Sequence, residues 1–85
     1  MMFAYYFFKD VQCFFEKLHK NGFLVFFDCK EEGVLNIRVL YDSDKLEILL
    51  DLFRDFQVGR KSFIEFACFN DNKLVIRYNF LGVEK

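Results

Sequence analysis

The chain has little of what cross-linked or metal-bound small proteins use. It contains three cysteines, four glycines, one histidine and no proline. Cys13, Cys29 and Cys68 are odd in number, far apart and free of any Cys-x-x-Cys spacing, which argues against a disulfide framework and against a zinc site. We therefore expect a reduced protein in the cytoplasm of a bacterial or host cell.

The groupings that catalysis requires are also missing. A catalytic site needs a nucleophile beside a base, a pair of carboxylates or a metal cluster. His19 is predicted on the exposed side of a helix near its C-terminus, and the acidic turn at Asp28, Glu31 and Glu32 lacks the ligand spacing of a calcium loop. The glycines lie singly and form no phosphate-binding loop. The sequence predicts no enzyme, no cofactor and no metal.

Long apolar runs and an excess of charge are absent too. The longest apolar run, Met1 to Phe8, is eight residues, whereas a membrane-spanning helix needs about 20. Twelve basic and 13 acidic side chains leave a formal net charge of −1, which creates no overall attraction to nucleic acid or to an anionic membrane. We expect a soluble protein without a targeting segment.

Phenylalanine is what the chain has in abundance. There are 14, and hydrophobic residues make up 54% of the 85. Aromatic burial can stabilise a domain of this size, but so small an interior cannot hold every ring, and exposed apolar patches usually mark an interface. The composition predicts one domain over residues 1–85 that binds a protein partner and forms a homodimer.

A weak internal repeat organises the chain. Residues 23–26 and 63–66 share a Phe-x-x-Phe pattern, and each is followed by Leu-x-Ile-Arg, at 35–38 and again at 74–77. A helical apolar period that ends at a glycine precedes each copy.

The repeat predicts two helix-plus-hairpin (αββ) units, over about residues 10–41 and 43–81. The expected fold is α+β, with an antiparallel sheet of four to five strands and both helices on one face.

The secondary structure of residues 2–8 is ambiguous. Their aromatic side chains favour a strand, although Phe3, Phe7 and Val11 keep helical spacing. We favour an additional N-terminal strand, which would give a ferredoxin-like order.

The second predicted helix carries two candidate surfaces. Its apolar residues cover an arc of about 200°, wider than the roughly 100° stripe of an ordinary surface helix. We therefore assign its flank, with Ile48, Leu52 and Phe56, to self-association.

Acidic residues form the other surface of this helix. Glu47, Asp51 and Asp55 recur every four residues on one face, and Asp44 precedes them. This acidic face predicts an inhibitor or adaptor whose partner is a basic, nucleic-acid-binding protein. Small phage proteins that inhibit bacterial defence systems, anti-CRISPRs among them, are analogous in size and charge alone.

The alternative function is RNA or DNA binding. In a ferredoxin-like sheet, Arg38, Arg77, Tyr6 and Phe26 would form a basic and aromatic platform on which bases stack. The glycine-aromatic strand motif of RRM domains is absent from residues 35–41.

Overall fold

Two helices and four strands form the fold. The computed structural model describes the backbone of residues 2–79 and the side chains of residues 11–79. Short 3₁₀ turns at Ser43–Lys45 and Lys61–Phe63 precede the second helix and the second hairpin. The main elements, in chain order, are α1 (Met2–Lys20), β1 (Leu24–Glu31), β2 (Val34–Leu40), α2 (Leu46–Gln57), β3 (Ile64–Asn70) and β4 (Lys73–Asn79).

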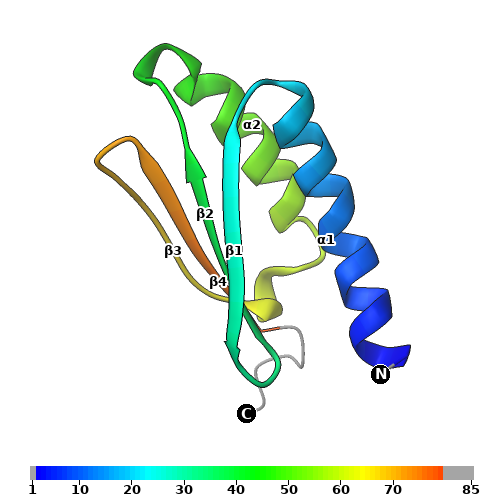
Figure 1. Ribbon diagram of the computed structural model, residues 1–85. Coiled ribbons are helices and arrows are strands. Elements are labelled where there is room, and N and C mark those ends of the chain that lie inside the picture. Colours follow the sequence, from blue (N-terminus) through cyan, green and yellow to red (C-terminus); the bar gives the residue numbers. More distant parts are fainter. Residues whose placement is uncertain (1, 80–85) are drawn as a thin grey trace.

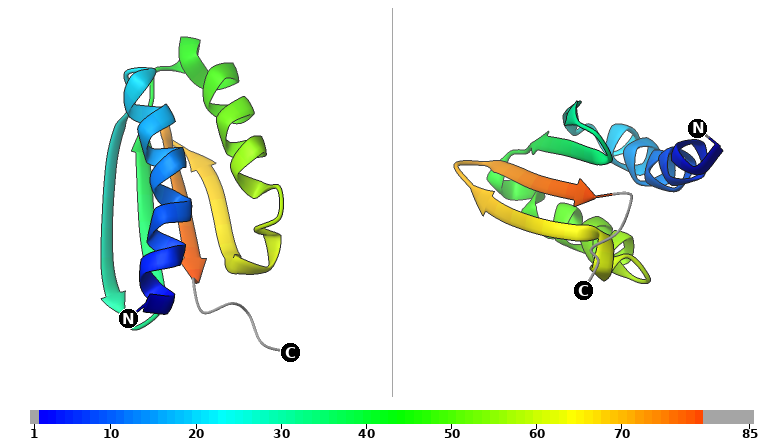
Figure 2. Two further views of the ribbon diagram at one scale, coloured as in Figure 1. Left: turned by 90° about the vertical axis from the view of Figure 1, so that its right-hand side faces the viewer. Right: turned by 90° about the horizontal axis from the view of Figure 1, so that it is seen from below.

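The four strands form one antiparallel sheet in the order β1-β2-β4-β3. The second strand of each hairpin is therefore central, and β1 and β3 are the edges. Both helices cover the same face of the sheet, and the opposite face is open (Figures 1 and 2). The expected α+β class, with two helices on one face of an antiparallel sheet, is confirmed. Among the described residues, neither helix is long and apolar enough to cross a membrane.

The predicted N-terminal strand is wrong. Residues 2–8 belong to α1, so the described residues form four strands and no ferredoxin-like order. The helical apolar spacing continues through Val11, Phe14 and Leu18, and no glycine or proline interrupts it. A helix also satisfies its backbone hydrogen bonds internally, whereas a fifth strand would need a sheet edge to pair with. Aromatic strand propensity was the weaker signal.

The end of α1 is fixed by a Schellman motif. The amides of Gly22 and Phe23 donate to carbonyl oxygens of the last turn at 3.0 Å, and Gly22 has a φ of 82°, which glycine adopts without a steric penalty. Lys45 Nζ donates to the Asn21 carbonyl at 2.8 Å and lies 5.6 Å from the centre of the Phe23 ring. Lys45, just before α2, therefore binds the C-terminal end of α1.

The core lies between the helices and the sheet. Alternate side chains of the central strands β2 and β4 face the helices and are buried, because successive side chains of a strand point to opposite faces. Phe14 of α1 and Phe56 of α2 stack at 4.3 Å with 14° between their planes, so the helices are joined to each other as well as to the sheet. The buried cluster consists of Val11, Phe14, Leu18, Phe23, Leu35, Ile37, Val39, Leu49, Phe53, Phe56, Leu74, Ile76 and Tyr78.

Candidate functional site

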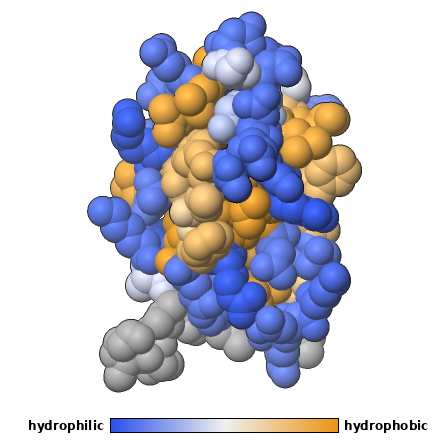
Figure 3. Space-filling model, turned by 90° about the vertical axis from the view of Figure 1, so that its left-hand side faces the viewer, coloured by the Kyte–Doolittle hydropathy of each residue, from blue (hydrophilic) through white to orange (hydrophobic). Residues whose placement is uncertain are grey.

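The open face of the sheet carries large exposed apolar side chains. The strand register sets Leu24 opposite Leu40 and places Phe66 on the same face, beside Arg77. Figure 3 shows hydrophobic surface over the middle of this face with hydrophilic surface around it. We define the open-face patch as Leu24, Phe26, Leu40 and Phe66, which are 61%, 47%, 37% and 52% exposed.

Arg38 lies within this patch. It faces Phe26 of β1 on one side and Val75 of β4 on the other, and its side chain is exposed. With the residues that the structure describes, it makes no hydrogen bond or ion pair. Its five N–H donors are therefore directed at solvent from an apolar setting, where a carboxylate from another molecule could accept them in pairs.

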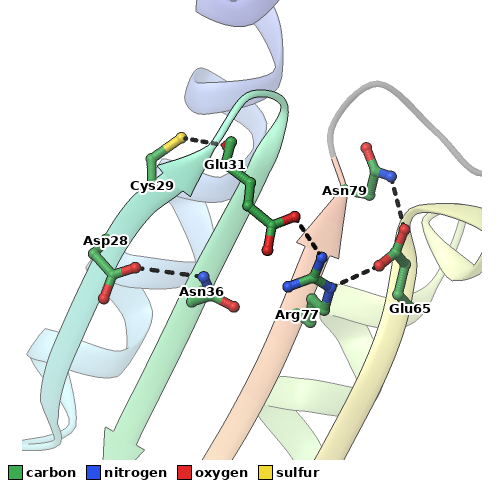
Figure 4. A network of polar contacts seen from close by, with 7 residues as sticks. All are labelled: Asp28, Cys29, Glu31, Asn36, Glu65, Arg77 and Asn79. Carbon is green, nitrogen blue, oxygen red and sulfur yellow. Dashed lines mark hydrogen bonds and ion pairs between the residues drawn. The ribbon is translucent and has the colours of Figure 1, made fainter.

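Arg77, in contrast, is already engaged (Figure 4). Its Nη2 is 2.8 Å from Glu31 Oε1, and its Nε is 2.8 Å from Glu65 Oε1. Asn79 Nδ2 donates to the second oxygen of Glu65 at 2.7 Å. The hydrogen bond with Glu31, followed by that with Glu65, raises the pKa of the Arg77 guanidinium above its ordinary value. These bonds join the turn end of β1 to both strands of the second hairpin.

The charges of the described residues on the open face balance. The register and the Arg77 contacts put three cations and three anions there, so the face has no net charge to attract phosphate groups. The cations are Arg38, Lys73 and Arg77, and the anions are Asp28, Glu31 and Glu65.

The predicted nucleic-acid platform is only partly assembled. Phe26 and Arg38 are direct cross-strand neighbours on the open face. Arg77 shares that face but is bonded to two glutamates, and Tyr6 belongs to α1, which covers the other face. The side chain of Tyr6 lies outside the described residues.

The acidic residues lie where the sequence suggested, along the outer side of α2. Glu47, Asp51 and Asp55 are exposed, and Asp44 is exposed in the 3₁₀ turn before the helix. Asp51 Oδ1 is 3.5 Å from Arg54 Nη1, an ion pair in which both side chains are over 70% exposed. Such a pair contributes little to stability, so these carboxylates remain available to a partner.

The residues assigned to self-association are divided between core and surface. Ile48 is 42% exposed, Leu52 is partly buried against the core and Phe56 is only 4% exposed. The wide apolar arc of α2 has a simple cause, since this helix packs on the sheet and on α1 through the Phe14–Phe56 stack.

The described residues offer little for catalysis or metal binding. They contain no group of three His, Cys, Asp or Glu side chains that could hold a metal, and no buried polar or charged residue. A groove of about 180 Å³ between α1 and α2, lined in part by Cys13, Lys17 and Asp55, is smaller than ordinary ligand pockets of about 300–1,000 Å³. A depression of about 640 Å³ runs along α1 past Cys13 and His19, both of which are exposed.

No protein-family model, curated protein or solved structure matches this chain. Of the open-face patch, sequence reasoning had named only Phe26, as part of the nucleic-acid platform. The alternation of β2 places Leu40 on the same side as Arg38, which was a usable signal. Phe66 had none, because the irregular pairing between Ile64 and Phe66 interrupts the alternation of β3.

Proposed function

We propose that this chain is a non-catalytic protein-binding module of the cytoplasm, an inhibitor or adaptor that binds its partner through the open face of the sheet. The observation that carries the proposal is the open-face patch with Arg38 inside it. Contiguous exposed apolar surface is uncommon on monomeric proteins unless it binds something.

The chemistry of the patch suits a protein partner. Burying apolar surface contributes about 25 cal/mol per Å², and two half-exposed phenylalanines supply much of that surface here. Aromatic and arginine side chains are enriched at the energetic centres of interfaces, where an arginine needs an acceptor once water is removed. The partner surface should therefore be apolar, with a carboxylate that meets Arg38.

The acidic face of α2 would contact a different part of a partner, or a second partner. Because both helices cover the face opposite the patch, Glu47, Asp51 and Asp55 point away from the open side of the sheet. Two surfaces on opposite sides of one small domain suit an adaptor. A basic protein, such as one that binds nucleic acid, is the partner that these carboxylates fit.

Affinity capture with matched variants tests the proposal. Wild-type protein, Arg38→Glu, Asp51→Lys and the control Lys20→Glu would be immobilised and exposed to lysate of cells that express the chain. All three positions are exposed, so folding should be retained. We expect proteins that bind the wild type and Lys20→Glu but are lost with Arg38→Glu. Identical capture by all four proteins would contradict the open-face interface.

Nucleic-acid binding is the second candidate, since Phe26 and Arg38 lie side by side. The balanced charges of the face and the engagement of Arg77 weigh against it. Fluorescence anisotropy with labelled single-stranded RNA and DNA over a salt series separates the two functions. Binding that weakens steeply with salt and falls with Arg38→Ala would favour this alternative.

The two αββ units remain part of the proposal. The internal repeat of Phe-x-x-Phe and Leu-x-Ile-Arg supports a duplicated unit. The sheet order supports it too, because the second strand of each hairpin is central. Residues 10–41 and 43–81 would be the two copies, although residues 80 and 81 lie outside the described part.

A further inference from the structure

The two edges of the sheet differ in how many large apolar side chains they expose. An edge strand presents unpaired N–H and C=O groups, and proteins usually guard it with a bulge, a charge or a proline. The edge strand β3 has irregular pairing at Glu65 and then pairs regularly, without a charged residue, from Phe66 to Asn70. Phe66 is the one large hydrophobic residue of β3 that is exposed. The edge strand β1 pairs regularly from Leu24 to Asp28, and residues 24–27 carry no charge. Its only irregularity lies beyond Asp28, next to the turn.

The β1 edge is apolar on both sides of the sheet. Phe26 and Leu24 project from the open face, where each is about half exposed or more. Phe27 lies on the helix side, stacked on Phe15 of α1 at 5.0 Å, and is still 48% exposed. A strand added alongside β1 would cover both sets of side chains and pair the free backbone groups.

We propose that β1 pairs antiparallel with β1 of a second copy of this chain, about a two-fold axis, so that two four-stranded sheets become one continuous sheet. This contact runs along the edge of the sheet and does not depend on the protein-binding proposal, although it covers part of Leu24 and Phe26 of the open-face patch. It leaves Arg38 and Phe66 of both copies exposed on one enlarged face.

Charge and symmetry favour a second copy as the occupant. With the axis at Phe26, Asp28 lies opposite Leu24 of the other copy, and with the axis at Phe27 it lies opposite Phe26. No like charges meet directly in either register. With the axis at Phe27, the Phe15–Phe27 stacks of the two copies meet. Pairing a strand with itself about a two-fold axis also closes this contact at two chains.

Matched substitutions on the two edges test this pairing. Phe26 and Phe66 are both half-exposed phenylalanines of edge strands, and each lies opposite an arginine, Arg38 or Arg77, of the neighbouring strand. Glutamate at position 26 therefore gains Arg38 as a neighbour in its own chain, and glutamate at position 66 gains Arg77, which also bonds Glu31 and Glu65. Only Phe26→Glu would set like charges directly against each other in the pairing, since the new carboxylate meets either its counterpart in the second copy or Asp28.

Light scattering over a dilution series gives the result. We expect wild type and Phe66→Glu to show twice the chain mass of 10.3 kDa, with Phe26→Glu dissociating at a concentration at least about tenfold higher. A monomeric wild type, an unaffected Phe26→Glu dimer or equal weakening by both substitutions would each overturn the proposal. Equal weakening would instead indicate contact through the open face.

Amide hydrogen exchange of the wild type provides a second readout that needs no variant. Outward-pointing amides of residues 24–28 should become more protected as protein concentration rises, whereas those of β3 should not change. Equal behaviour of the two edges would contradict pairing through β1, even if Phe26→Glu failed to fold.

Discussion

The aromatic stack between Phe14 and Phe56 should be needed for the stable packing of α1 against α2. Phe14 is 3% exposed and Phe56 4%, and their rings lie 4.3 Å apart. Truncating a buried phenylalanine to alanine typically costs about 3–5 kcal/mol, because transfer free energy is lost and a cavity remains. At about 0.05–0.15 kcal/mol per residue, the 85-residue chain has a free energy of unfolding of about 4–13 kcal/mol. Phe14→Ala therefore removes a large share of it.

Urea denaturation followed by far-ultraviolet circular dichroism measures this loss. The matched control is Phe66→Ala, since Phe66 is half exposed on the open face and its truncation should cost less than about 1 kcal/mol. The double variant Phe14→Ala/Phe56→Ala should be less unstable than the sum of the single variants by about 0.5–1.5 kcal/mol, the worth of an aromatic pair beyond its area. Equal losses for Phe14→Ala and Phe66→Ala would refute the assignment of one ring to the core and the other to binding.

Three further substitutions probe two turns and the ion-pair network around Arg77. Gly22→Ala should lower the free energy of unfolding by about 1–2 kcal/mol, because φ is 82° and the new Cβ would lie 2.8 Å from Lys45 Nζ. Gly59→Ala, with φ of 77° and no atom near its Cβ, should cost less in the same urea titration. Arg77→Met should lower the urea midpoint by leaving Glu31 and Glu65 without their shared cation. The difference in urea midpoint between wild type and Arg77→Met should narrow in about 1 M salt, where charges are screened within about 3 Å. A difference that does not depend on salt would indicate that lost packing of the Arg77 side chain causes the destabilisation.

Local patterns in the sequence determined whether most elements are helices or strands and which of their faces is buried. Alternation along β2 and β4 placed Leu35, Ile37 and Ile76 in the core, because successive strand side chains point to opposite faces. The 3.6-residue period located α2, and Gly22 marked the end of α1. At residues 2–8 two local signals disagreed, and the helical period outweighed the strand propensity of the aromatic residues.

Only the tertiary structure decided which residues share a surface. The order β1-β2-β4-β3 brings Glu31 within 2.8 Å of Arg77, 46 residues away, and no local pattern encodes that contact. The same order assembles the open-face patch from β1, β2 and β3 and leaves Arg38 among apolar side chains. The sequence determined periodicity, which is a property of neighbours along the chain. Strand order and register depend on which distant segments pair, and they decided which phenylalanines are core and which are surface.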